Sequence, residues 1–243
     1  MRITFICSFL ITLICLNIES YAQPVLDDIK LEQIRQKTVR KYIKCQIKEG
    51  KHQFNDIQAS WHNGQNLSFY NRNEMTFFLN GNLQDIWQSH LLVNPSKLWN
   101  NRRSSLGLML QKFPANIFYN RDSLANTDTG QVYFLNLKLL SGIFNLPVAF
   151  EIISIDAREK IIEFSYIKGN QSLGVQQIKF IALDDKHTKI LHISYFKSKS
   201  NFRDKYLYPF FHKKFIKDFH RNMKKLLTVE HQVGVKLEIL NKY

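Results

Sequence analysis

The sequence is poor in cysteine. Of its three cysteines, Cys7 and Cys15 lie in an N-terminal segment that we expect to be removed, which leaves Cys45 as the only thiol of the mature chain. A single thiol cannot form an internal disulfide, so the sequence excludes a disulfide-stabilised scaffold. The fold must therefore depend on its apolar core, for which nineteen phenylalanines and ten tyrosines supply ample surface.

Sequence signatures of several enzyme classes are also missing. The chain contains no G-x-S-x-G nucleophile elbow, no P-loop and no dinucleotide-binding glycine fingerprint. No base is suggested near Cys45, and the acidic pair Asp184-Asp185 falls in a hairpin turn, where aspartate is favoured for backbone reasons. The motifs therefore predict no catalytic residue, no metal site and no cofactor.

The longest apolar run is too short to span a membrane. It extends from Ile3 to Leu16, whereas a spanning helix needs ~20 apolar residues. Arg2 precedes the run, and Ser20-Tyr21-Ala22 places small residues where a signal peptidase reads them. We predict a signal peptide over residues 1–22, cleaved near Ala22, and a periplasmic or extracellular protein. An N-terminal membrane anchor is the alternative.

Acidic residues are few compared with basic ones. The chain has 34 lysines and arginines against 20 acidic residues, a formal net charge of +14. A strongly basic protein is drawn to polyanions such as nucleic acid, anionic lipid or acidic polysaccharide. Export argues against nucleic acid, so peripheral contact with an anionic membrane surface is the more natural expectation. A solvated basic face is the default interpretation.

The first part of the mature chain, residues 23–73, reads as a helical extension. A helix is predicted from Leu26 to Ile47, with acidic residues near its start and Gly50 available to end it. Its apolar residues form only a loose stripe, so it could be a peripheral packing helix or a partly mobile arm. A polar, turn-rich segment over residues 62–73 then marks a boundary.

From Glu74 the pattern changes to strands and short helices. "EMTFFLN" predicts a strand, and Asn82 is a plausible N-cap for a helix over "LQDIWQSHLL" that stops before Pro95. A second short helix is expected within residues 96–110. Extended segments with short turns follow, and connections this short imply an antiparallel meander. The six segments are "MLQKF", "GQVYFLNLKLL", "LPVAFEIISI", "KIIEFSYIKG", "VQQIKFIAL" and "TKILHISYFKS".

The segment Tyr206–Leu227, "YLYPFFHKKFIKDFHRNMKKLL", predicts a long amphipathic helix with Pro209 in its first turn. At roughly 100° per residue, one side is apolar and the opposite side is basic. The apolar side comprises Tyr208, Phe211, Phe215, Phe219 and Leu226; the basic side comprises Lys213, Lys214, Lys217, Arg221, Lys224 and Lys225.

Two histidines lie on this predicted helix. His212 falls on the apolar side and His220 at the border, and their spacing of eight residues does not match the i, i+4 spacing of a helical metal pair. The other histidines are scattered, with no accompanying cluster of carboxylates or cysteines: His52, His62, His90, His187, His192 and His231. A core or rim histidine is the default interpretation of His212.

The order of these elements resembles the helix-grip architecture of the START/Bet v 1-like (SRPBCC) superfamily, in an exported branch. The resemblance covers roughly residues 74–228 and is carried by "EMTFFLNGNLQDIWQSHLLVNPSKLWNN", "YIKGNQSLGVQQIKFIAL" and the last helix. It implies an α+β fold in which a curved antiparallel sheet of about six or seven strands grips the C-terminal helix. Residues 229–243 form a tail that could add an edge strand.

The resemblance also implies an apolar cavity between sheet and helix. Its candidate lining residues are Tyr133, Phe150, Tyr166, Tyr208, Phe211, His212, Phe215 and Phe219. We therefore expect an exported, non-catalytic protein that binds a hydrophobic or amphipathic small molecule such as a lipid. One alternative is an enzyme that uses the same cavity with His212 as acid or base. The other is a surface-interaction protein whose lysines dock to anionic envelope lipid while the phenylalanines are occupied inside.

Overall fold

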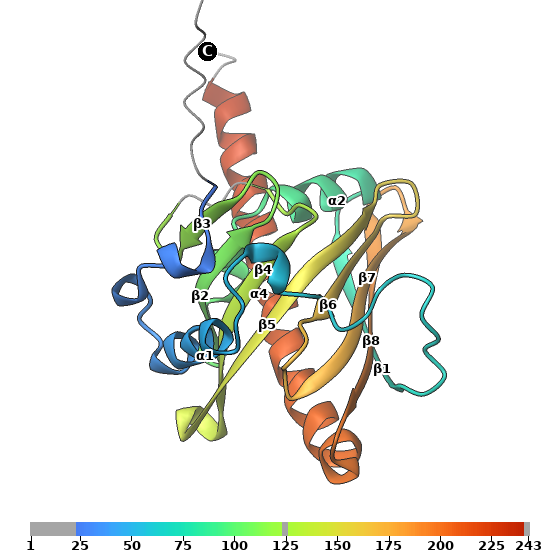
Figure 1. The fold of residues 1–243 in the computed structure, drawn as a ribbon. Coiled ribbons are helices and arrows are strands. Elements are labelled where there is room, and N and C mark those ends of the chain that lie inside the picture. The colour runs from blue at the N-terminus through green and yellow to red at the C-terminus, as the bar shows by residue number, and fades with distance from the viewer. Residues whose placement is uncertain (1–22, 123–125, 241–243) are drawn as a thin grey trace, which may run out of the picture.

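The protein is an α+β structure in which an eight-stranded antiparallel sheet curves around a long C-terminal helix (Figure 1). The computed structural model describes the backbone of residues 23–122 and 126–240 and the side chains as far as Thr228. The predicted signal peptide, residues 1–22, lies outside the described residues. The predicted helix-grip class is confirmed, with one strand more than the largest number expected.

The elements follow one another in a simple order. The strands are β1 (Asn71–Asn80), β2 (Ser104–Gln111), β3 (Asn116–Tyr119), β4 (Gln131–Leu139), β5 (Phe144–Asp156), β6 (Ile161–Tyr166), β7 (Ser172–Asp184) and β8 (His187–Ser198). The α-helices are α1 (Lys37–Lys48), α2 (Leu83–Leu92), α3 (Pro95–Trp99) and α4 (Tyr208–Leu240). Short helical turns are η1 (Leu26–Asp28), η2 (Leu31–Gln33), η3 (Phe54–Asp56), η4 (Leu140–Gly142) and η5 (Arg203–Leu207).

The sheet is built on a meander, β4 to β8, and its first strand pairs with its last. Its order is β1-β8-β7-β6-β5-β4-β2-β3, and every neighbouring pair is antiparallel. β1 pairs with β8 along its whole length, from Asn71 opposite Phe196 to Asn80 opposite His187. The predicted meander is therefore confirmed, and β3 is an additional edge strand whose four residues gave too short a pattern to predict.

α4 lies across one face of the sheet, and α2 and α3 cover the same face toward one end (Figure 1). The core between them is rich in aromatic side chains. Its fully buried members include Trp87, Tyr133, Phe150, Phe164, Phe180 and Phe219. Burial of each such side chain stabilises the fold by roughly 1.5–3 kcal/mol. The fold therefore depends on this aromatic core for its stability, as the cysteine content led us to expect.

The N-terminal segment packs on the opposite face of the sheet (Figure 1). The prediction of one helix from Leu26 to Ile47 is wrong, because only α1 is α-helical and two short 3₁₀ turns, η1 and η2, precede it. Leu26, Ile29 and Ile34 are all buried in a second core cluster, and separate turns let each side chain reach it. Tertiary burial thus overrides local helix preference here.

A buried ion pair fastens this outer layer to the sheet. Lys112 Nζ donates to Glu151 Oε1 at 2.7 Å and also to the backbone oxygen of Ile57 at 2.7 Å. Ala59 forms an isolated antiparallel bridge with Ile167. The division into an extension and a domain stays a prediction, but the extension shares its core with the sheet.

The second short helix expected within residues 96–110 is α3, and the later part of that segment is strand β2, whose alternate residues point into the two cores. Two further predictions need correction. Pro209 is the second residue of α4, but the π-helical turn η5 starts the helical backbone before it. The tail forms no edge strand as far as Leu240, because each residue added to an existing helix gains one hydrogen bond without a new nucleus.

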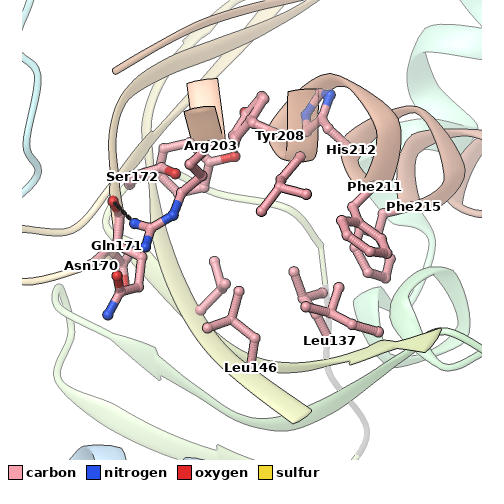
Figure 2. A pocket seen from close by; sticks show the side chains of 14 residues that line it. Leu137, Leu146, Asn170, Gln171, Ser172, Arg203, Tyr208, Phe211, His212 and Phe215 are labelled. Atoms are coloured by element: carbon pink, nitrogen blue, oxygen red, sulfur yellow. Dashed lines mark hydrogen bonds between the residues drawn. The ribbon is translucent and has the colours of Figure 1, made fainter. Parts of the chain in front are cut away.

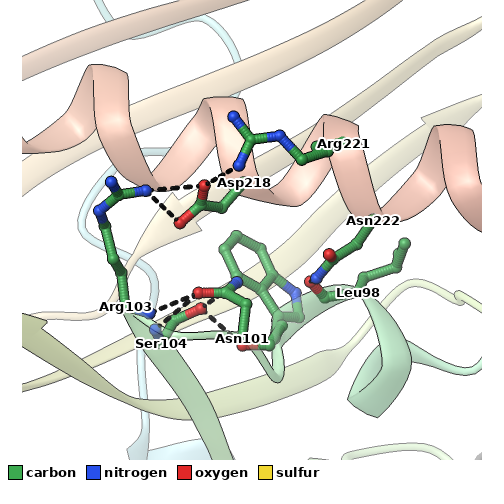
Figure 3. Close-up of polar contacts among 8 residues, drawn as sticks. Leu98, Asn101, Arg103, Ser104, Asp218, Arg221 and Asn222 are labelled. Carbon is green, nitrogen blue, oxygen red and sulfur yellow. Dashed lines mark hydrogen bonds and ion pairs between the residues drawn. The ribbon is translucent and has the colours of Figure 1, made fainter.

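Polar contacts fasten α4 to the segment between α3 and β2 (Figure 3). Arg103 Nη1 donates to both carboxylate oxygens of Asp218, at 2.8 and 2.7 Å, and Arg221 Nη1 donates to the same carboxylate at 3.1 Å. Asn222 Nδ2 donates to the backbone oxygen of Leu98 at 2.8 Å. These contacts fix the position of the middle of α4 relative to the sheet.

Within the described ranges, no helix is both long and apolar enough to cross a bilayer.

Candidate functional site

A cavity of about 390 Å³ lies between the sheet and the first turns of α4 (Figure 2). Strands β4 and β5, the β6–β7 turn, η5 and α4 all contribute to its wall. The lining residues are Leu137, Leu139, Leu146, Val148, Tyr166, Asn170, Gln171, Ser172, Arg203, Leu207, Tyr208, Phe211, His212 and Phe215. Its volume is within the range of about 300–1,000 Å³ that is usual for small-molecule sites.

The wall of the cavity is polar on one side and apolar on the others. Figure 2 shows Arg203 beside Gln171, whereas Leu137 and Leu146 face Phe211 across the cavity. Arg203 is the only formally charged residue among the described lining residues. Its Nη1 donates to the backbone oxygen of Gln171 at 3.1 Å, and it forms no ion pair with any residue that the structure describes. The cavity thus offers donors to a polar group at one side and hydrocarbon elsewhere.

Five of the eight predicted lining residues border this cavity: Tyr166, Tyr208, Phe211, His212 and Phe215. The other three, Tyr133, Phe150 and Phe219, lie deeper and surround a void of only about 30 Å³. Aromatic packing fills that deeper region, with the rings of Tyr133 and Phe150 stacked at 5.1 Å between centroids. The role of all eight in binding stays a prediction.

Two tyrosines in the cavity wall, Tyr166 and Tyr208, share a cluster of hydroxyl hydrogen bonds. Tyr166 Oη and Tyr208 Oη are 2.6 Å apart, and Tyr208 also lies 2.8 Å from Ser194 Oγ. Gln176 Nε2 donates to Tyr166 Oη at 2.8 Å. Burial raises the pKa of both tyrosines, so both hydroxyls are neutral at ordinary pH. Their hydrogen bonds are satisfied within the protein.

The hydroxyl cluster continues into a buried histidine network. Both His212 Nε2 and His192 Nε2 contact Gln176 Oε1, at 2.8 and 2.9 Å. A carboxamide oxygen only accepts, so both Nε2 atoms carry the proton. His192 Nδ1 then accepts from His220 Nε2 at 3.0 Å, and His212 Nδ1 accepts from Asn73 Nδ2 at 3.3 Å. One glutamine therefore sets the tautomer of three histidines.

Burial keeps these histidines neutral. It lowers the pKa of His212 to about 3 and that of His90, which packs edge-on against Phe180 and Phe219, to about 4. The pKa values of His192 and His220 are also well below the usual value, first because of burial and second because of neighbouring histidines. None of the four can serve as a proton carrier near neutral pH without a change in its surroundings.

The predicted acid or base role of His212 meets a specific obstacle. A second polar group does lie within hydrogen-bond reach, as that hypothesis requires, but Gln176 and Asn73 occupy both ring nitrogens of His212. His212 contributes the rest of its ring to the cavity wall, stacked at 4.8 Å on Tyr208. No three His, Cys, Asp or Glu side chains come together as a metal site within the described part of the chain.

Sequence reasoning missed the network because it treated the histidines as scattered. His192 has Ile190 and Ser194 as its neighbours on the same face of β8, and Ile190 belongs to the core beneath α4. Strand alternation therefore could have placed His192 on the inner face. The meeting with His220 depends on how α4 crosses the sheet, which no local pattern specifies.

No family model and no curated protein matches the sequence. Similar solved structures include a point mutant of norcoclaurine synthase from Thalictrum flavum, with a TM-score of 0.49 and 13% identity over 67% of this chain and 96% of that chain. A conserved protein from Geobacillus kaustophilus has a TM-score of 0.45 and 13% identity over 65% and 95%. Major latex-like protein 151 from Panax ginseng has a TM-score of 0.44 and 11% identity over 63% and 96%.

Similarity to solved structures at 11–13% sequence identity concerns only the fold. The architecture follows from the chain itself: β4 to β8 form a meander, β1 adds to its β8 edge, β2 and β3 add to its β4 edge, and a long C-terminal helix lies across the inner face. The molecule thus has a helix-grip fold, with a cavity under its last helix.

Proposed function

We propose that the protein binds an amphipathic small molecule in the cavity between β4, β5 and α4, without catalysing a reaction on it. The observation that carries the proposal is the cavity of about 390 Å³, in which apolar side chains from sheet and helix face each other beside one charged residue, Arg203. Burial of apolar ligand surface supplies roughly 25 cal/mol per Å² before the costs of binding are subtracted. A volume near the low end of the usual range favours a single-chain or small-ring ligand.

The position of Arg203 gives the ligand an orientation. The ligand's polar end would lie near the Arg203 guanidinium and the exposed Gln171, where water is accessible, and its apolar body would extend toward Phe215. Hydrogen bonds to a charged group contribute about 1.5–3 kcal/mol, so an anionic head group would be preferred over a neutral one. A long-chain carboxylate satisfies both ends of the cavity.

Two aspects of the proposal concern setting and chemistry. Export, inferred from residues 1–22, would place the protein where lipids and secreted metabolites are its available ligands. A binding role fits the cavity wall, where the hydrogen bonds of Tyr166, Tyr208 and His212 are satisfied within the protein. An enzymatic role would require His212 to release one of its two partners.

Titration with a fluorescent long-chain carboxylate tests the proposal. Leu146→Trp places a large ring in the cavity and should weaken binding at least about ten-fold, because it removes the space that the chain fills. Leu183→Trp, on the exposed end of β7, is the matched control and should bind as the unchanged protein does. Absence of binding by the unchanged protein, or equal binding by Leu146→Trp, would contradict the proposal.

A second pair of variants tests the orientation. Arg203→Gln should weaken binding of the carboxylate about ten-fold and leave binding of the matching long-chain alcohol unchanged. Arg158→Gln removes an exposed arginine from the β5–β6 turn and should change neither. Equal effects of Arg203→Gln on acid and alcohol would refute the orientation and leave the cavity assignment standing.

A further inference from the structure

Large apolar side chains are exposed on two segments beside the cavity. On the hairpin that joins β4 to β5, Leu140, Ile143 and Phe144 are 53%, 77% and 60% exposed. Around the start of the last helix, the exposed apolar residues are Phe202, Tyr206, Leu207 and Phe210. These two segments hold seven of the twelve exposed large hydrophobic side chains in the described part of the chain. We call these seven residues the rim.

The rim belongs to the same end of the molecule as the cavity opening. The hairpin contributes Leu139 and Leu146 to the cavity wall, and the helical segment contributes Leu207 and Phe211. In Figure 1 the tip of the hairpin and the start of the last helix both lie at the lower end of the view. Exposed apolar side chains gathered at one end of a molecule are typical of a site of contact with another molecule or a membrane.

The same two segments carry almost only positive charge. Over residues 136–148 and 197–217 the charged residues are Lys138, Lys197, Lys199, Arg203, Asp204, Lys205, Lys213, Lys214 and Lys217. Asp204 is the single acidic residue among them; it is buried and accepts a hydrogen bond from the backbone of Ser198 at 2.8 Å. The surface around the rim therefore combines exposed apolar side chains with unopposed lysines.

We propose that the rim docks the protein onto an anionic lipid surface with the cavity opening turned toward the membrane. Apolar side chains would enter the head-group region while the lysines contact lipid phosphates, as interfacial proteins do. A second copy of the chain fits this surface poorly, because two rims would bring like charges together. The inference rests on the proposed function for its purpose, since a ligand could then pass between bilayer and cavity.

This surface differs from the one that the helix pattern suggests. The sequence predicts docking through the basic side of the last helix alone, with its phenylalanines occupied inside, and the structure exposes Phe210 and Phe202 instead. Lys224 and Lys225 lie about 17 Å farther along the helix than Lys213, at 1.5 Å per residue. The two surfaces can therefore be separated by substitution.

Co-sedimentation with vesicles tests the apolar part of the rim. The purified protein should bind vesicles of phosphatidylcholine and phosphatidylglycerol in equal parts and bind pure phosphatidylcholine vesicles weakly. The double substitution Ile143→Ser and Phe144→Ser should weaken binding at least about ten-fold. Leu92→Ser with Leu183→Ser removes similarly exposed apolar side chains elsewhere and should leave binding unchanged. All variants are prepared with the same first residue, so that the predicted signal peptide is either present in all of them or absent from all of them.

Charge variants locate the docking surface. Lys138→Gln with Lys205→Gln should weaken binding to the mixed vesicles about five-fold for each charge removed. Lys224→Gln with Lys225→Gln should have a clearly smaller effect. Added salt should weaken binding of the unchanged protein, because the lysine contacts are exposed to solvent.

Several outcomes would overturn the docking proposal: no binding to the mixed vesicles, equal loss in the rim and control variants, or equal loss in the two lysine pairs. Light scattering could also show that the unchanged protein is a dimer and that the double variant Ile143→Ser, Phe144→Ser is a monomer. That result would assign the rim to self-association and would overturn the docking proposal. Leu146→Trp should bind vesicles normally, so loss of ligand binding and loss of docking are measured separately.

Discussion

The interior beneath α4 has two halves that differ sharply in packing. In the inner half, Trp99 and Phe219 lie 4.6 Å apart between ring centroids, Phe150 and Phe164 lie 4.9 Å apart, and the side chains surround a void of about 30 Å³. In the outer half, the same sheet and the same helix enclose about 390 Å³. The cavity is therefore not a general looseness of the fold.

The sequence of β5 shows where the difference begins. Phe150 and Ile152 fill the inner half, whereas Val148 and Leu146, the preceding residues on the same face, line the cavity. The strand thus changes from a large ring to smaller aliphatic side chains between positions 150 and 148. Core packing is normally close to crystal density, so the outer half is the part of the interior with room for the proposed ligand.

Acid should destabilise the packing of α4 on the sheet, through His90 in the inner half and His212 at the cavity wall, and this is the largest effect we expect. His90 and His212 have pKa values of about 4 and about 3, against about 6.5 in the unfolded chain, so the unfolded state takes up protons that the folded state does not. Stability is then complete above about pH 6.5 and decreases as pH falls toward 4, by up to about 1.4 kcal/mol per pH unit for each such histidine. Urea unfolding across this pH range measures it.

His90→Phe keeps an aromatic ring in the core. Because one fewer proton is taken up on unfolding, the free energy of unfolding should fall less steeply as the pH falls, by up to about 1.4 kcal/mol per pH unit. His62→Gln is the matched control and should leave the slope unchanged, because His62 is exposed and forms no ion pair with any residue that the structure describes. A stability that is flat between pH 7 and pH 4.5 would mean that the buried histidines are not held neutral.

Truncation of one ring in each half compares the two directly. Phe150→Ala in the inner half should lower the free energy of unfolding by about 3–5 kcal/mol, because it opens a new hole in a packed core. Phe211→Ala beside the existing cavity should lower it by less than about 2 kcal/mol. Urea denaturation of both variants gives the values, and equal losses would show that the halves do not differ in packing.

Filling the outer half should have the smallest effect on stability. Leu146→Trp has room to place its ring in the cavity, so the free energy of unfolding should change by less than about 1.5 kcal/mol. Val132→Trp, at a fully buried position of β4 on the other face of the sheet, should lower it by about 1–3 kcal/mol or more. Thermal unfolding monitored by circular dichroism suffices, and a large loss from Leu146→Trp would argue that the outer half is already full.

Much of the fold could be predicted because its signals are local. The Asn82 side chain caps α2 by accepting from the backbone N–H of Asp85 at 2.9 Å, as the spacing suggested. The turn between β7 and β8 and the amphipathic course of α4 were also predicted correctly. Each of these features depends on residues within a few positions of one another.

The remaining features depend on distant contacts or on missing volume. The helix predicted from Leu26 divides because its apolar residues find partners on the sheet, such as Leu108 and Phe134. The histidine network joins positions 176, 192, 212 and 220, which only the folded sheet and helix bring together. A cavity is an absence of side chains, and no residue type marks it in the sequence.

The location of a bound chain tests the central claim most directly. A crystal soaked with a fatty acid that carries bromine on its terminal carbon would reveal the chain end by anomalous scattering. The account predicts bromine in the outer half, near Phe215, with the carboxylate beside Arg203. Bromine on the outer face of the sheet, in the packed inner half, or at no ordered position would contradict it.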